Sequence, residues 1–220
     1  MILEIDNIEL SFHSKPILEA IYIKAEKGKV TGILGKNGCG KSSLFRIIFG
    51  SLQPKHKLIR LNKKAITQKF YKIGMVAYLP QNNFIPKELL LKKVFGLYKG
   101  SWQRFTSIFE ELALYENSKI KELSGGERRI LEIYLVLQLG VKVVLLDEPF
   151  SNIAPLQIEK IKTLIHQEKS NKIILLSDHF YEDVLDVCER LYLIEGTRSI
   201  AIKNQKDLES YGYLTTKDSQ

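Results

Sequence analysis

The octapeptide Gly35-Lys36-Asn37-Gly38-Cys39-Gly40-Lys41-Ser42 matches the phosphate-binding pattern G-x-x-x-x-G-K-[ST] without substitution. The apolar segment 29–34 precedes it and predicts a buried strand, and segment 43–49 has the apolar spacing of a helix and stops at Gly50. In a strand–loop–helix unit, backbone N–H groups and the positive end of the helix dipole face the same point, where a polyphosphate binds. An ordinary glycine-rich turn is the alternative, and the flanking segments favour the nucleotide site.

The motif assigns a chemical role to each of its polar residues. Lys41 is expected to reach the β- and γ-phosphates, and Ser42 is expected to ligate Mg²⁺. Cys39 is expected to be a small structural residue of the loop, although a helix N-terminus can also lower the pKa of a thiol. The other residues expected to contact the nucleotide are Gly35, Asn37, Gly38, Gly40 and Ser43, together with Cys39 as part of the loop.

Length and composition predict one α/β domain with room for a small inserted subdomain. The chain has 220 residues, of which 45% are hydrophobic, and no apolar run approaches the roughly 20 residues that cross a bilayer. Residues 1–6 do not resemble a signal peptide, and two distant cysteines give no disulfide framework, so a reducing cytosol is expected. The net charge of +8 fits either a nucleic acid or an anionic membrane surface, and charge alone does not choose between them.

Patterns along the chain predict an α/β core interrupted by a helical insertion. Strands are expected at 2–11, 17–25, 29–34, 56–61, 73–79, 142–147, 172–177, 190–195 and 198–202. Helices are expected at 43–49, 88–95, 101–114, from about 125 to 139, and at 155–169, 181–189 and 206–211, followed by a polar tail. Ser124 and Glu127 are expected to form a capping box, and Pro155 to open a helix.

Asp147 and Glu148 end an apolar strand and are the second chemical signal. Burying an unpaired charge is energetically costly, so adjacent carboxylates at the end of a buried strand indicate that they bind a positively charged group. Asp147 is expected to hold Mg²⁺ directly or through water, and Glu148 to orient or deprotonate an attacking water. Two solvated acids before a strand-ending proline are the alternative.

Several motifs in a fixed order resemble the ATP-binding cassette (ABC) ATPases. The phosphate-binding loop is followed by Tyr78-Leu79-Pro80-Gln81, Leu123-Ser124-Gly125-Gly126-Glu127, Asp147-Glu148-Pro149 and Asp178-His179, so the resemblance covers essentially the whole chain. It implies an α/β P-loop NTPase (RecA-like) core with a mixed sheet, an N-terminal antiparallel β subdomain and an inserted α-helical subdomain. Residues 1–220 would form one ABC ATPase domain, with its core in 1–81 and 121–220 and its helical subdomain in 82–120.

The resemblance also implies roles for individual residues. Phe12 would stack on adenine, Gln81 would sense Mg²⁺ and the attacking water, and His179 would contact the γ-phosphate. Ser124 and Gly126 would contact ATP bound to a second subunit. One chain with one phosphate loop and one signature sequence therefore implies a head-to-tail dimer with itself or a paralogous cassette.

The expected function is that of an ATP-hydrolysing subunit that uses Mg-ATP to power a separately encoded membrane transporter. It would lie in the cytoplasm at the inner face of the cell membrane, with a permease subunit contacting region 82–110 and no nucleic acid bound. A nucleic-acid or ribosome-associated ATPase and a nucleotide-dependent regulator with low turnover are the alternatives. Apolar residues of the insertion are candidates for the permease groove, although a core position is favoured for each: Phe84, Leu89, Phe95, Trp102 and Phe105.

One position departs from the family pattern. Members usually have Ser-x-Leu-Asp after the catalytic strand, whereas this chain has Ser151-Asn152-Ile153-Ala154. The usual aspartate touches the partner's phosphate loop, so weaker communication between the two ATP sites is expected. Alternatively, Asn152 or a nearby backbone group substitutes for it.

Overall fold

The phosphate-binding loop lies between strand β3 (Val30–Leu34) and helix α1 (Lys41–Phe49), as the sequence predicts. This arrangement comes from a computed structural model, which describes residues 1–214; residues 215–220, the end of the predicted polar tail, lie outside the described residues. All five residues of β3 are buried, and Gly50 ends α1 with a positive φ of 100°. Such a left-handed residue is the usual way in which a helix stops at glycine.

Strand β3 is a central member of a mixed six-stranded sheet with the order β10-β9-β3-β8-β7-β6. Only the edge pair β9–β10 is antiparallel; the other neighbours are parallel. The remaining strands are β6 (Val76–Leu79), β7 (Val143–Asp147), β8 (Ile173–Ser177), β9 (Arg190–Glu195) and β10 (Arg198–Ile202). Because parallel strands end at the same edge, the residues that follow β3, β6, β7 and β8 come together there.

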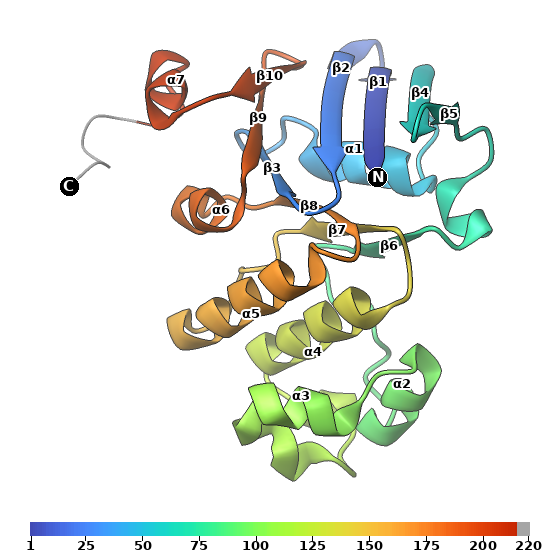
Figure 1. Cartoon of the computed structure of the whole chain (residues 1–220), viewed down its shortest axis with the longest axis vertical. Helices are drawn as coiled ribbons and strands as arrows, with labels where there is room; N and C mark the ends of the chain where they lie inside the picture. Colours follow the sequence, from blue (N-terminus) through green and yellow to red (C-terminus); the bar gives the residue numbers. More distant parts are fainter. Residues whose placement is uncertain (215–220) are drawn as a thin grey trace.

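A second, antiparallel sheet has the order β2-β1-β4-β5 and packs over α1. Its strands are β1 (Ile2–Phe12), β2 (Lys15–Glu26), β4 (His56–Leu61) and the two-residue β5 (Lys64–Ala65). Figure 1 shows α1 between this sheet and the mixed sheet. The apolar side of α1, which includes Leu44, Phe45 and Ile48, therefore contributes to a core shared by both sheets.

Helices cover the opposite face of the mixed sheet. α4 (Gly125–Gln138) and α5 (Pro155–Glu168) lie side by side below it in Figure 1, and α6 (Tyr181–Val187) lies beside β3. Residues 129–137 of α4 are buried, so this helix is the centre of the second core. The chain ends its described part with α7 (Gln205–Ser210).

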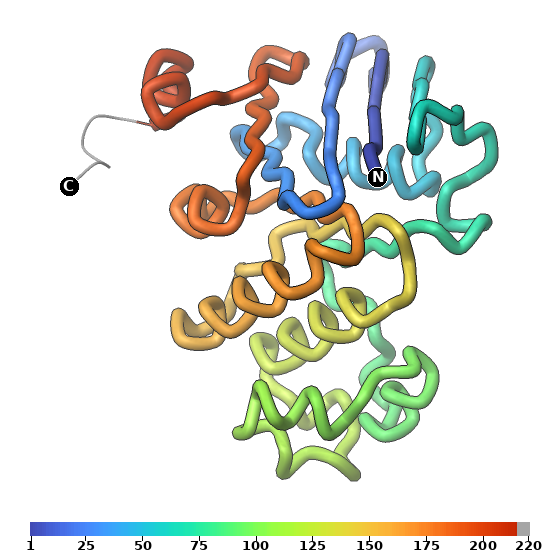
Figure 2. Tube along the Cα trace, viewed as in Figure 1, coloured from blue at the N-terminus to red at the C-terminus, as the bar shows by residue number. Residues whose placement is uncertain are grey.

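Between β6 and α4 the chain leaves the core and forms a helical region, which Figure 2 shows in green at the bottom of the view. The region contains α2 (Leu91–Tyr98), α3 (Trp102–Ile108) and the short 3₁₀ helices η2 (Glu110–Tyr115) and η3 (Ile120–Glu122). Phe95 and Phe105 are buried, whereas Phe84, Leu89 and Trp102 are partly buried and pack against the same core. The preference for a core position is thus confirmed for Phe95 and Phe105, whereas the other three pack against the core with part of their surface exposed.

Three predicted boundaries were wrong for local reasons. The strand expected at 73–79 begins at Val76, because η1 (Phe70–Ile73) precedes it and Gly74 turns the chain with φ 66°. The helix expected at 88–95 begins at Leu91, because Leu90 pairs with Lys119 in an isolated β-bridge. The helix expected at 101–114 is broken at Phe109, whose backbone (φ −117°, ψ 69°) is not helical.

None of the helices described within residues 1–214 combines the length and the apolar character needed to cross a membrane.

Candidate functional site

The carboxyl edge of the mixed sheet holds a pocket of about 630 Å³. Most of the predicted site residues meet there, although they come from five separate stretches of the chain. The lining consists of Phe12, Ile17, Asn37, Gly38, Gly40, Lys41, Ser42, Ser43, Gln81, Glu148 and His179. Five predicted residues are not part of the lining: Gly35, Cys39, Asp147, Ser124 and Gly126.

The phosphate-binding loop forms one wall of the pocket. Gly40 has φ 106°, and a Cβ at this position would lie 2.8 Å from the Leu18 side chain, so only glycine fits. Lys41 is 6% exposed, and its Nζ donates hydrogen bonds to the carbonyl oxygens of Gly35 (2.6 Å) and Lys36 (3.3 Å). The ammonium group is therefore fixed at the base of the loop. Phe12, 46% exposed at the end of β1, gives the pocket a flat apolar side.

Cys39 is a packing residue of this loop. A Cβ at Gly35 would lie 2.5 Å from its Sγ, so the thiol occupies the space beside that glycine. Burial raises the pKa of the Cys39 thiol, although the nearby Lys41 charge opposes the change. The structural interpretation of Cys39 therefore holds, and the depressed thiol pKa considered from the sequence is contradicted.

Asp147 is held by two hydrogen bonds at the end of β7. Ser177 Oγ donates to its Oδ1 and Tyr78 Oη donates to its Oδ2, both at 2.9 Å, and the residue is 1% exposed. Burial, followed by the adjacent Asp147 charge, raises the pKa of Tyr78, so the phenol stays protonated and remains a donor. Sequence reasoning gave no role to Tyr78 or Ser177, since their hydroxyls meet Asp147 only after the strands pair.

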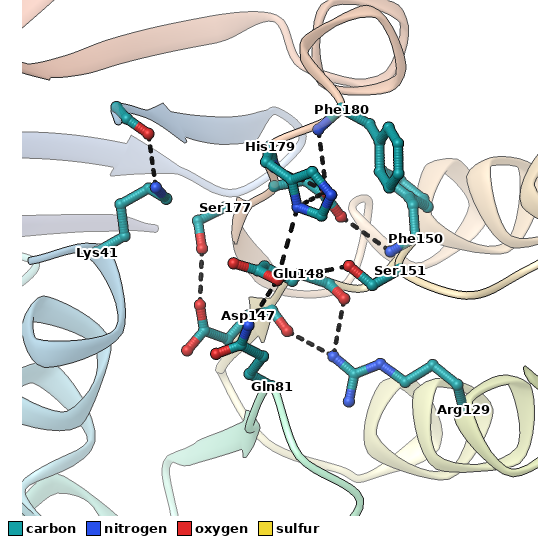
Figure 3. Close-up of polar contacts among 12 residues, drawn as sticks. Lys41, Gln81, Arg129, Asp147, Glu148, Phe150, Ser151, Ser177, His179 and Phe180 are labelled. Carbon is teal, nitrogen blue, oxygen red and sulfur yellow. Dashed lines mark hydrogen bonds and ion pairs between the residues drawn. The ribbon is translucent and has the colours of Figure 1, made fainter. Parts of the chain in front are cut away.

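Glu148 projects into the pocket from a strained backbone. Its φ is 49°, in the left-handed region that costs a non-glycine residue roughly 1–3 kcal/mol and that often marks functional sites. Its Oε2 accepts a hydrogen bond from Gln81 Nε2 at 2.8 Å and lies 3.6 Å from His179 Nδ1. Figure 3 shows Gln81 and His179 on opposite sides of this carboxylate. The structure thus groups three residues that the sequence could only place at separate strand ends.

Arg129 is a site residue that sequence reasoning missed. It comes from α4, is 4% exposed, and its guanidinium donates hydrogen bonds to the carbonyl oxygens of Pro80, Asp147 and Glu148. These bonds hold the backbone on both sides of the Gln81–Glu148 contact. Figure 3 shows the two bonds to Asp147 and Glu148. The available signal was a second arginine directly after Ser-Gly-Gly-Glu-Arg, at the start of a buried helical stretch.

Asp178, the residue before His179, organises two loops, a role that the sequence alone does not predict. It is fully buried, and its carboxylate accepts hydrogen bonds from the backbone N–H groups of Phe150 (2.9 Å), His179 (2.8 Å) and Phe180 (3.1 Å). Burial raises the pKa of Asp178, and these donors oppose the change. The turns after β7 and β8 are therefore fixed to each other.

The signature segment lies outside the pocket, at the start of α4. The predicted capping box is confirmed: Ser124 Oγ accepts from Glu127 N at 3.3 Å, and Glu127 Oε2 accepts from Ser124 N at 2.7 Å. A Cβ on Gly126 would lie 2.7 Å from the carbonyl oxygen of Asn152, so glycine lets the helix approach the 151–154 loop. Ala154, the residue that departs from the family pattern, is the N-cap of α5 and offers no side-chain cap.

The donor set suits a magnesium–nucleotide complex. Mg²⁺ prefers oxygen ligands and usually binds through one or two carboxylates together with water and substrate phosphates. Ser42 and Gln81 line the pocket, and Asp147 keeps acceptor capacity beyond its two hydrogen bonds. Within residues 1–214 there is no group of three His, Cys, Asp or Glu side chains of the kind that forms a metal centre from protein alone. The residues therefore fit a metal ion that arrives with phosphate.

Comparison with known proteins assigns the family. A sequence model of the ABC transporter family matches residues 18–151, which is more than half of the chain. The chain belongs to the ABC transporter family. A lipopolysaccharide export system ATP-binding protein, LptB of Haemophilus influenzae, is 30% identical over 91% of this chain and 89% of the relative. The arabinose import ATP-binding protein AraG of Mannheimia succiniciproducens is 26% identical over 88% of this chain and 42% of the relative.

Solved ABC structures share the fold. The ATP-binding subunit of an ABC transporter superposes with a TM-score of 0.81 at 20% identity, covering 96% of this chain and 94% of that one. A nucleotide-free ATP-binding cassette gives a TM-score of 0.76 at 25% identity, covering 99% and 97%. This ABC protein is therefore an ATP-binding transporter subunit whose family activity is ATP hydrolysis, and the predicted fold class is confirmed.

Proposed function

We propose that this ABC subunit hydrolyses Mg-ATP as a head-to-tail dimer and powers a membrane transporter encoded as a separate chain. The observation that carries the proposal is the contact group Gln81–Glu148–His179 facing the phosphate-binding loop across one pocket. Hydrolysis requires a base beside the γ-phosphate and positively charged groups that bind the phosphates. Glu148 lies on one side of the pocket, and the phosphate-binding loop with Lys41 lies on the other.

Glu148 is the proposed base for the attacking water. Its carboxylate is the only acid side chain that lines the pocket among the described residues. The amide of Gln81 and the imidazole of His179 approach the same oxygen, Oε2, and so fix the carboxylate's orientation. Glu148 accepts a proton from water as the water oxygen attacks the γ-phosphorus, and the bond to the ADP oxygen breaks.

The phosphate loop supplies the opposing charge. Lys41 is already immobilised at the base of the loop, so little side-chain entropy is lost when a phosphate replaces its carbonyl partners. Magnesium, when bound through Ser42, Gln81 and Asp147, neutralises charge on the phosphate oxygens. Phe12 provides the aromatic surface on which adenine stacks.

A second subunit completes the site. Ser124 is exposed, and neither it nor Gly126 lines the pocket of its own chain. The N-terminus of the 14-residue helix α4 therefore offers backbone N–H groups and a positive dipole end to a nucleotide held by another copy or a paralogous cassette. We assign residues 1–81 and 121–220 to the ATPase core and 82–120 to its helical subdomain. Region 82–110 is the proposed contact with the permease, on the cytoplasmic side of the membrane.

The substitution Glu148→Gln tests the proposal. The variant keeps a hydrogen-bonding side chain of the same size but cannot accept the proton, so steady-state hydrolysis should fall at least ~100-fold. ATP binding should persist, and sedimentation should show a dimer that depends on Mg-ATP.

Lys41→Ala is the matched control, because it should lose nucleotide binding and the ATP-dependent dimer together. Wild-type turnover in Glu148→Gln would exclude Glu148 as the base. A wild-type protein whose melting temperature does not respond to saturating Mg-ATP would overturn the nucleotide site itself.

A further inference from the structure

The segment that carries Gln81 is fastened at both ends to helix α4. Before Gln81, the carbonyl oxygen of Pro80 accepts a hydrogen bond from Arg129 Nη1 at 2.6 Å. After it, the backbone N–H groups of Phe84 and Ile85 both donate to Glu132 Oε1, at 2.9 and 3.1 Å. Arg129 and Glu132 lie three residues apart and so share one face of the helix.

Between these two attachments the segment has little support of its own. Gln81, Asn82 and Asn83 are exposed, and among the described residues 1–214 the two asparagines make no hydrogen bond. Within the described part of the chain, the Gln81 side chain hydrogen-bonds only to Glu148. The position of Gln81 in the pocket therefore depends on the two points at which its segment is attached to α4.

Glu132 is costly at its position. It is 1% exposed in the buried stretch of α4, and an ionised carboxylate there must be compensated by hydrogen bonds. Its Oε1 receives the two backbone donors, but Oε2 has no hydrogen-bond partner among the described residues and lies 3.9 Å from Arg129 Nη1. Buried ionic groups are often less stabilising than apolar residues of the same volume, so stability alone does not account for a glutamate here.

The structure assigns Glu132 as a positioning residue for ATP hydrolysis: its Oε1 holds the far end of the Gln81 segment, while Arg129 holds the near end and the backbone of Glu148. Glu132 reaches no reacting atom and acts through Gln81. This assignment rests on the proposed roles of Gln81 and Glu148.

The test compares two substitutions of equal length. Glu132→Gln retains a carbonyl oxygen that accepts both backbone N–H groups, whereas Glu132→Met fills the same space without a strong acceptor. Glu132→Met should lower kcat about ten-fold or more, since small displacements of catalytic groups have effects of this order. Its KM for ATP should stay within about two-fold, because the phosphate loop is untouched, and Glu132→Gln should recover most of kcat.

Two further measurements separate positioning from general destabilisation. Without nucleotide, the amides of Phe84 and Ile85 should exchange hydrogen faster in Glu132→Met than in the wild type, and Glu132→Gln should protect them. Glu168→Met is the matched control: Glu168 is also a buried helical carboxylate, but its partners are Arg104, Gln138 and Lys172. It should lower the melting temperature and leave kcat near the wild-type value.

A double-mutant cycle with Gln81→Ala decides the assignment. If Glu132 acts through Gln81, adding Glu132→Met to Gln81→Ala should change kcat less than two-fold, which is the non-additivity expected of coupled residues. A full additional loss in the double variant, or a Glu132→Gln variant as impaired as Glu132→Met, would overturn the assignment while leaving the ATPase proposal intact. A wild-type protein without ATPase activity would instead overturn the proposed function, and the positioning role with it.

Discussion

The carboxyl group of Asp147 depends on neighbours that only the folded chain provides. Ser177 and Tyr78 come from strands on either side of β7, and each satisfies one carboxylate oxygen. A buried carboxylate with one oxygen left unpaired loses part of its stabilisation and the constraint on its orientation. Tyr78 is therefore expected to matter for both folding and magnesium binding, although it does not line the pocket.

We predict that Tyr78→Phe lowers the free energy of unfolding by about 1–2 kcal/mol, because the phenyl ring keeps its packing against Phe49 while Asp147 loses a donor. The Mg²⁺ concentration for half-maximal ATPase activity should rise several-fold. Chemical denaturation and a magnesium titration at fixed ATP measure the two effects.

Tyr71→Phe is the control, since the Tyr71 ring also stacks on Phe49 but is 38% exposed, and among residues 1–214 its hydroxyl makes no hydrogen bond to Asp147. An unchanged magnesium requirement in Tyr78→Phe would show that Ser177 alone orients the carboxylate.

The residues that could be predicted from the sequence belong to recognisable motifs that come after a strand. Lys41, Gln81, Glu148 and His179 each belong to a short motif at a strand end, and the parallel sheet brings such ends together. Tyr78, Arg129 and Glu132 were missed because their roles depend on which backbone group lies opposite after packing. A phenol in a strand and two charged residues in a helix carry no such information in the sequence.

At the scale of secondary-structure elements, helix ends at glycine or proline were predicted correctly. Other helix and strand ends differ from the prediction because tertiary contacts determine them. Gly50 and Pro155 end α1 and begin α5 as predicted. Helix α2 instead starts three residues late, because Leu91 N bonds to the carbonyl oxygen of Ser118 across the helical region. That hydrogen bond joins residues 27 positions apart in the sequence, and no local sequence pattern predicts it.

Helix α5 begins without a capping side chain, which makes Ala154 a test of stability as well as of function. The first turn contains no acidic residue either, so its N–H groups have no side-chain acceptor and no complementary charge, although the N–H of Gln157 donates to the carbonyl oxygen of Ala154. We predict that Ala154→Asp raises the free energy of unfolding by about 1 kcal/mol, measured by denaturant titration. Ala154→Asn should give a similar gain, and a loss in both variants would show that the N-cap geometry does not accept a side chain.

The same pair of variants tests communication between the proposed ATP sites. The wild type should hydrolyse ATP with a Hill coefficient close to one, because the charged contact usual in the family is absent. Ala154→Asp should raise the coefficient, whereas Ala154→Asn, which caps α5 without a charge, should raise it less. Strong positive cooperativity in the wild type that is unchanged in Ala154→Asp would mean that Asn152, itself left-handed with φ 62°, or a neighbouring group already makes the contact.

At the scale of the whole molecule, the antiparallel sheet and the helical region lie at opposite ends, with the ATP pocket's sheet between them (Figure 1). The helical region exposes apolar side chains that its own core does not cover, including Leu90 (45%) and Leu97 (64%). Both lie in or beside α2, within the proposed permease contact. This end of the molecule is therefore where association with a membrane partner is expected to gain apolar contact.

We predict that the double variant Leu90→Lys/Leu97→Lys is lost from the membrane fraction of cells while the purified protein keeps its ATPase activity. Burying a leucine contributes about 1.5–3 kcal/mol, so losing two such contacts should weaken association by roughly 100-fold or more.

Tyr22→Lys is the control, because Tyr22 is 45% exposed on β2 at the other end of the molecule and should leave association unchanged. Equal loss in both variants would point to nonspecific effects of added charge. Wild-type protein that stays off membranes but shows salt-sensitive stimulation by RNA or DNA would favour the nucleic-acid alternative, because release of phosphate counterions makes such binding fall steeply with salt.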